Sequence, residues 1–233
     1  MTESASANQR HYCMAVGPRT GPRGTRAAVL KDFAWEPGQT ITVRFLSGSQ
    51  ELRARVAAVA AEWTTATTAN LRFVVVDRGR ADIRISFVAG DGSWSTIGTV
   101  AGQVAQAEAT MNYGWLTDDS PEDELRRVVL HEFGHAIGLI HEHQNPQHPI
   151  DWNRDAVIRD LSGPPNSWDL ETIEHNMFAH YTQAEVEATN TDPKSIMMYP
   201  IPLAWTNDGF SAALNDELSP LDRELVSRSY PAQ

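Results

Sequence analysis

The sequence predicts an α+β fold, and three features of the chain lead to it. The first half of the chain contains segments in which apolar and polar residues alternate, as in strands, and one amphipathic helical segment. A largely apolar helical segment follows, and polar, proline-containing stretches dominate the remainder. Apolar faces of helices and strands must be buried against one another, so helices are expected to pack on a sheet. We therefore expect a mixed twisted sheet with two long helices, followed by an irregular part with a terminal helix.

The composition suits one soluble domain. The 233 residues can bury a sizeable core, and their net charge is −11 at pH 7. Such an acidic chain argues against a nucleic-acid-binding surface. No apolar run approaches the length that spans a bilayer. We expect a monomer with neither nucleic acid nor a membrane as a partner.

Residues 1–30 are expected to form an N-terminal extension or linker. Residues 17–24 are rich in glycine and proline, which break helices and central strands. Residues 1–10 are polar and lack the apolar centre of a signal peptide, so we expect a cytoplasmic protein or one exported by another route. Cys13 is the single cysteine, which excludes an intrachain disulfide.

Hydrophobic periodicity predicts the elements of the first half in order. We expect a strand at 40–46, a helix at 50–67, strands at 71–76 and 82–88, a glycine-rich loop at 90–98 and a further strand at 106–113. The segment 71–76 is largely apolar, which indicates a buried strand.

A second long helix is expected to begin at Ser120. The serine suits the N-cap, Pro121 suits the first turn, and the acidic residues 122–124 complement the positive end of the helix dipole. The helical patterns at 154–161 and 170–180 are weaker. Ser219, which precedes a proline, repeats the N-cap signature and predicts a closing helix that ends before Pro231.

The segment from His131 to Glu142 carries the chemistry. His131 and His135 are four residues apart, so on a helix both imidazoles project from one face and can bind one zinc ion. Glu132 lies beside the first ligand, where it can act as the general base toward water at the metal. Gly138 lets the chain leave the helix, and the turn can bring His141 round as a third ligand. Three protein ligands leave a fourth position open, as catalysis requires, so we expect one zinc ion per chain.

The motif H-E-x-x-H-x-x-G-x-x-H resembles the signature of the metzincin zinc peptidases, which is followed by a methionine turn. Residues 195–199, Ser-Ile-Met-Met-Tyr, resemble that turn as it occurs in the astacin branch. The resemblance implies that Met197 lies under the zinc site and that Tyr199 is a switchable zinc ligand or an oxyanion donor. Glu142, directly after the third histidine, is also astacin-like. His143 and His148 are expected to be loop histidines.

The resemblance implies a metzincin-type catalytic domain at residues 31–233, with an upper part to about residue 141 and a lower part at 142–233. The expected function is zinc-dependent endopeptidase, and residues 92–98 resemble the segment leading to the strand that pairs with an extended protein or peptide substrate. Two alternatives stay open. One is a dedicated toxin or effector protease acting on a single target protein, and the other is a zinc-bound, non-hydrolytic peptide-recognition module.

Cys13 has two interpretations. It is either an ordinary free cysteine or a latency ligand whose thiolate occupies the open zinc position, since thiolate is a favoured zinc ligand.

Overall fold

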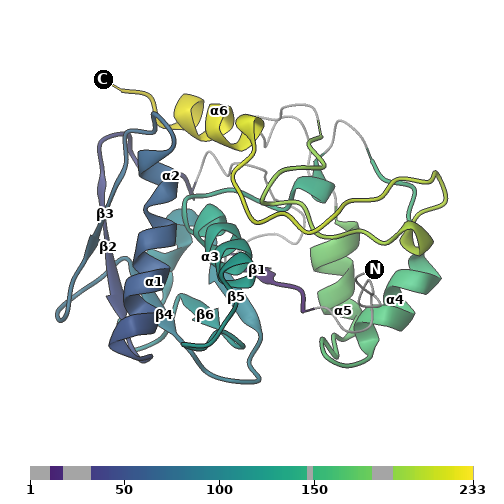
Figure 1. The fold of residues 1–233 in the computed structure, drawn as a ribbon, viewed down its shortest axis with the longest axis horizontal. Helices are drawn as coiled ribbons and strands as arrows, with labels where there is room; N and C mark the ends of the chain where they lie inside the picture. The colour runs from purple at the N-terminus through teal and green to yellow at the C-terminus, as the bar shows by residue number, and fades with distance from the viewer. Residues whose placement is uncertain (1–10, 18–32, 146–148, 180–190, 233) are drawn as a thin grey trace.

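The computed structural model describes residues 11–17, 33–145, 149–179 and 191–232 (Figure 1). Its centre is a six-stranded sheet with strand order β1-β5-β6-β4-β2-β3. The strands are β1 (Met14–Val16), β2 (Thr40–Phe45), β3 (Arg72–Val75), β4 (Ile83–Ser86), β5 (Ser93–Thr96) and β6 (Met111–Tyr113). β5 runs antiparallel to β6, and the other neighbouring strands are parallel. The predicted mixed sheet of an α+β fold is confirmed.

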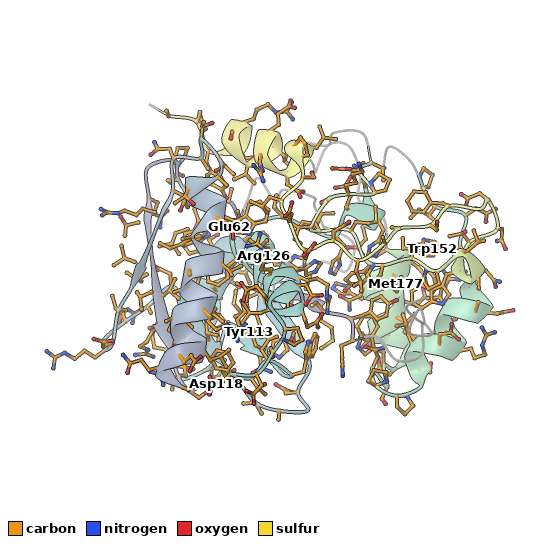
Figure 2. All side chains as sticks on the ribbon, in the orientation of Figure 1. Glu62, Tyr113, Asp118, Arg126, Trp152 and Met177 are labelled. Atoms are coloured by element: carbon orange, nitrogen blue, oxygen red, sulfur yellow. The ribbon has the colours of Figure 1, made fainter. Side chains whose placement is uncertain are left out.

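Two helices pack with the sheet around the larger apolar core. They are α1 (Gln50–Ala60) and α3 (Glu122–Ala136), which lie in contact with each other (Figure 1). The short helix α2 (Glu62–Thr65) continues α1, and Glu62 forms an ion pair with Arg126 of α3, with Nη2 3.0 Å from Oε2 (Figure 2). The Trp63 indole is fully buried and donates to the Leu130 carbonyl at 2.9 Å. These contacts fix α3 against the rest of the core.

The chain after α3 is irregular, as expected. Its helical segments are η4 (Glu142–Gln144), α4 (Arg154–Ser162), α5 (Leu170–Ile173), η5 (Glu174–Phe178), η6 (Leu203–Trp205) and α6 (Pro220–Ser229). Within the described part of 142–232, β-pairing is limited to two isolated bridges. A second apolar cluster, centred on the buried Trp205, joins α4, α5 and η6. The candidate site lies where this cluster meets the larger core.

Four predictions about elements need correction. The strand at 71–76 is β3, which lies at the sheet edge, so Val75 is 51% exposed rather than buried. The expected loop at 90–98 contains β5 (Ser93–Thr96), in which Ser93 and Ser95 are buried. Ser93 Oγ accepts from the Gly114 amide, and the Ser95 hydroxyl donates to the Thr96 carbonyl. β6 is shorter than the strand expected at 106–113, and η3 (Gly98–Gln103) precedes it.

The fourth correction concerns the start of α3. Ser120 does not cap this helix: its hydroxyl accepts from the Thr117 amide at 2.9 Å, and Pro121 occupies the N-cap position. The closing helix follows its prediction, since Ser219 and Asp222 form a reciprocal capping box at the start of α6. In the described parts of the chain, every helix is too short or too polar to cross a membrane.

Candidate metal centre

Helix α3 and the turn after it bring three imidazoles together. His131 and His135 lie one turn apart on α3 and are buried. Gly138 has φ +95°, a left-handed conformation that ends the helix and reverses the chain. His141 then returns to the same point, and the ligand nitrogens of the three histidines lie within 4.8 Å of one another. The three residues predicted as metal ligands therefore converge.

Backbone carbonyls fix which ring nitrogen faces the centre. His131 Nδ1 lies 2.9 Å from the Ile196 carbonyl oxygen, and His135 Nδ1 lies 2.8 Å from that of Leu139. A carbonyl oxygen only accepts, so each Nδ1 must carry the proton and each Nε2 presents a lone pair. Burial lowers the pKa of His131 well below its ordinary value and that of His135 to about 4, so both rings stay neutral. Neutral, oriented imidazoles are what a metal ion requires.

The geometry fits zinc. His135 Nε2 and His141 Nε2 are 3.2 Å apart. Two nitrogens bound tetrahedrally to one zinc ion at 2.0–2.1 Å would lie about 3.3 Å apart. His131 Nε2 is buried without a hydrogen-bond partner among the described residues. An ion at this point would satisfy that atom and bridge the other two.

Glu132 directly follows His131 in the sequence and is fully buried. Neither carboxylate oxygen has a hydrogen bond of ordinary geometry within the described structure. Burial raises the pKa of this carboxyl well above its ordinary value. Tyr113 of β6 is also buried, and its hydroxyl has no hydrogen-bond partner among the described residues. Burial raises the pKa of this hydroxyl, and the nearby Glu132 charge raises it further. A buried carboxylate whose pKa is raised by burial suits proton transfer.

The predicted methionine turn lies under the centre. Met197 is buried, and a Cβ at Gly134 of α3 would collide with its sulfur atom, so the turn packs directly on the helix. The Glu142 amide donates to the Met197 carbonyl at 3.0 Å. The Glu142 side chain accepts from the Asp192 amide at 3.0 Å, and burial raises the pKa of this carboxyl to about 8. Glu142 thus ties the start of the irregular part to the turn.

A second buried carboxylate braces the turn from below. Asp222 accepts from the Ser195 hydroxyl at 2.6 Å and from the Ile196 amide at 2.8 Å. Ile196 in turn accepts from His131 through its carbonyl. Helix α6 is therefore connected to a candidate metal ligand through a single residue, Ile196, a connection that local sequence patterns do not reveal.

Tyr199 lies over the ligands. Its ring centroid is 4.2 Å from that of His141 and 5.7 Å from that of His131. Its hydroxyl donates to the Cys13 carbonyl. His143, expected as a loop histidine, is instead buried beside His141 and Tyr199, with Nε2 2.8 Å from the Asn176 carbonyl. His148, by contrast, lies outside the described residues.

The described part of the N-terminal extension crosses this site. β1 pairs in parallel with β5 and lies in the centre of the molecule beside α3 (Figure 1). Cys13 is buried, and its thiol lies near enough to Glu132 for that charge, after burial, to raise the pKa of the thiol. The grouping with metal-ligand spacing holds the three histidines and not Cys13. Sequence reasoning missed the neighbour Tyr12, which packs into the second apolar cluster.

Comparisons with known proteins agree with this geometry. The matrixin family matches residues 34–148. A structure of myroilysin is similar with a TM-score of 0.84 and 38% identity, covering 88% of this chain and 99% of that one. Another myroilysin structure gives a TM-score of 0.71 and 35% identity, covering 98% and 94%.

Two further proteins share parts of the pattern. High choriolytic enzyme 1, a hatching enzyme zinc-protease from Oryzias latipes, has the same fold with a TM-score of 0.58 and 17% identity, covering 87% of this chain and 96% of that one. Interstitial collagenase of Bos taurus is 37% identical over 90 residues, which cover 34% of this chain and 19% of the collagenase. The match thus spans about a fifth of that relative. On the near-complete likeness to myroilysin and the converging histidines, the chain belongs to the metzincin family of zinc metalloendopeptidases.

Proposed function

We propose that this chain is an astacin-like, zinc-dependent endopeptidase with Glu132 as its general base. The observation that carries the proposal is the convergence of His131, His135 and His141, each with an Nε2 atom facing the same point. Residues 195–199 support the astacin-like assignment through their resemblance to that branch's methionine turn. Domain residues 31–233 would form the catalytic unit, and one zinc ion per chain would bind.

The chain's own residues then divide the work. A zinc ion held by His131, His135 and His141 would supply Lewis acidity, which lowers the pKa of water and polarises a carbonyl group. Glu132 takes the proton of the attacking water and passes it to the leaving amine. Its buried surroundings support this role, because they raise the pKa of the carboxyl above its ordinary value.

Tyr199 has the role of oxyanion donor in this proposal. Its ring lies against His141 and its hydroxyl faces the site, where it now donates to the Cys13 carbonyl. A hydroxyl that already donates to a carbonyl oxygen at this point has suitable geometry for the oxygen of a substrate. Met197 and Glu142 act as supports beneath the ligands.

We further propose that the substrate binds as an extended strand on β5. A substrate resembling those of the family would run antiparallel to this edge and gain main-chain hydrogen bonds. In the structure, β1 pairs with this edge of β5 in parallel, which is the direction opposite to that of the proposed substrate. Its presence supports a latent state in which residues 12–16 block the cleft, and Cys13 contributes either by lying against Glu132 or by binding the metal.

The proposal is tested with the purified full-length chain and a panel of unfolded protein substrates. We expect about one zinc ion per chain, and any cleavage should stop on chelation and return when zinc is restored. Cleavage that persists after complete metal removal would contradict the proposed chemistry.

A further inference from the structure

Tyr12, two residues before β1, fills a pocket in the second apolar cluster. It is 3% exposed, and its ring stacks on Trp205 with centroids 5.4 Å apart and 28° between planes. It meets Tyr199 edge-on at 5.3 Å and Trp168 edge-on at 6.3 Å. These separations and angles are the ones that aromatic pairs prefer. The pocket therefore matches an aromatic ring in shape and in orientation.

The polar end of Tyr12 is matched as well. Its hydroxyl donates to the Pro200 carbonyl at 3.0 Å in a buried setting. Its amide donates to the Asn166 side-chain oxygen at 2.9 Å. Both acceptors belong to the irregular part of the chain, far from Tyr12 in sequence. The N-terminal segment is therefore held here as a bound peptide would be.

The pocket continues into the candidate catalytic centre. The hollow beside Tyr12 is also lined by Cys13, His131 and Tyr199. Cys13, the next residue, lies against the proposed general base Glu132. Tyr12 therefore lies in the pocket, and the next residue, Cys13, lies beside the proposed general base, where the scissile bond of a substrate would lie.

The direction of β1 shows which substrate residue would use this pocket. β1 follows Cys13 and runs parallel to β5, whereas the proposed substrate runs antiparallel. In a reversed chain, the residues before the scissile bond take the place of β1, and the residue directly after the bond takes the place of Tyr12. We infer that this pocket selects an aromatic side chain, tyrosine or phenylalanine, directly after the scissile bond, and that Tyr12 is its internal occupant. The inference rests on the proposed peptidase function.

An acidic side chain is the main competitor, because Arg127 also lines the hollow. Its guanidinium is already paired with both oxygens of Glu124, with Nε 2.9 Å from Oε2 and Nη2 2.6 Å from Oε1. Trp115 donates to the same carboxylate at 2.8 Å. The charge of Arg127 is thereby balanced, and the apolar walls around Tyr12 decide the preference.

A binding test does not depend on catalysis. The zinc-loaded full-length chain is compared with Tyr12→Ala, which empties the pocket, and with Tyr12→Phe, which keeps the ring. The probe is N-acetyl-tyrosinamide, followed by saturation-transfer NMR. We expect Tyr12→Ala to bind N-acetyl-tyrosinamide at least about tenfold more tightly than the parent chain or Tyr12→Phe does. The same variant should bind the leucine and glutamate analogues at least about fivefold more weakly than it binds N-acetyl-tyrosinamide. A folded Tyr12→Ala chain without this selectivity would overturn the inference. If Tyr12→Ala does not fold, Tyr12→Ser, which also removes the ring, serves with the same expectation.

A cleavage test separates the two proposals. Matched peptides that differ only after the scissile bond are given to the Tyr12→Ala chain. Tyrosine and phenylalanine should exceed alanine and glutamate in kcat/KM by about tenfold or more, a discrimination that pocket contacts commonly supply. Cleavage without an aromatic preference would overturn the pocket assignment alone. Selective binding of N-acetyl-tyrosinamide would instead contradict the peptidase function if neither Tyr12→Ala nor Tyr12→Ala/Cys13→Ala, which also removes the side chain beside Glu132, cleaves any peptide.

Discussion

The hydroxyl of Tyr199 donates a hydrogen bond to the backbone carbonyl of Cys13, a residue 186 positions away in the sequence. The proposed oxyanion donor is thus occupied by the segment that covers the cleft. The same contact both demonstrates that a carbonyl oxygen fits opposite Tyr199 and explains how the segment would exclude a substrate. The following predictions separate these consequences.

Tyr199→Phe should lower kcat by roughly 10²–10³, with little change in KM, because a donor to the oxyanion acts mainly in the transition state. Steady-state kinetics on one peptide checks this. Tyr230→Phe is a matched control that removes a buried hydroxyl bound to the Ile137 carbonyl rather than to the segment at Cys13, and should leave kcat unchanged. A loss confined to KM would assign Tyr199 to substrate packing.

Cys13→Ala in the full-length chain should raise peptidase activity at once, because it removes the side chain that lies against Glu132. Initial rates are measured in the presence of reductant, so that oxidation does not contribute. Cys13→Ser, which keeps a small polar side chain, should give a smaller rise. Equal rates in all three chains would leave Cys13 as an ordinary thiol.

Asp222→Ala should lower the free energy of unfolding by roughly 3 kcal/mol, because it leaves the buried Ser195 hydroxyl and the Ile196 amide without their acceptor. It should also weaken zinc binding by roughly 10–100-fold, since Ile196 orients His131. Urea denaturation and a zinc titration measure the two effects. Glu224→Ala, which removes a half-exposed ion pair on the same helix, should change stability by less than about 0.5 kcal/mol. Similar effects from both variants would contradict the bracing role.

Tyr230 predicts a loss of stability at high pH. Burial raises the pKa of its hydroxyl to about 12. Above pH 10 the unfolded chain loses this proton while the folded chain keeps it, so ionisation favours unfolding. The free energy of unfolding of the parent chain, relative to that of Tyr230→Phe, should fall by about 2 kcal/mol between pH 8 and pH 11.5. Denaturant unfolding at both pH values gives this difference, and a constant difference would contradict the assigned burial effect.

Contiguous motifs made the centre of the site predictable. His131, His135 and Gly138 act through local geometry, since helical spacing and one left-handed residue suffice to bring the ligands together. The capping box of α6 is local in the same sense. Burial of a whole segment is less local, which explains why the edge position of β3 was not visible in its apolar sequence.

The remainder depends on contacts between distant segments. β5 lies between glycines and carries polar residues that become buried only when its neighbours pair with it. Tyr12 is positioned by its contacts with Trp205 and Pro200, and no periodic pattern in residues 11–17 predicts those contacts. His143 is held in the site by a contact with the Asn176 carbonyl of η5. Such long-range partners decide which side chains close the site.

The most direct test of the account is Glu132→Gln, assayed for zinc and hydrolysis on the same preparation. The substitution keeps the size of the side chain and touches none of the three histidines, so about one zinc ion per chain should remain bound. Loss of the general base should lower kcat by roughly 10²–10⁴. Retained zinc with this loss of turnover is the predicted result, and full hydrolytic activity in the zinc-loaded variant would contradict the proposed chemistry.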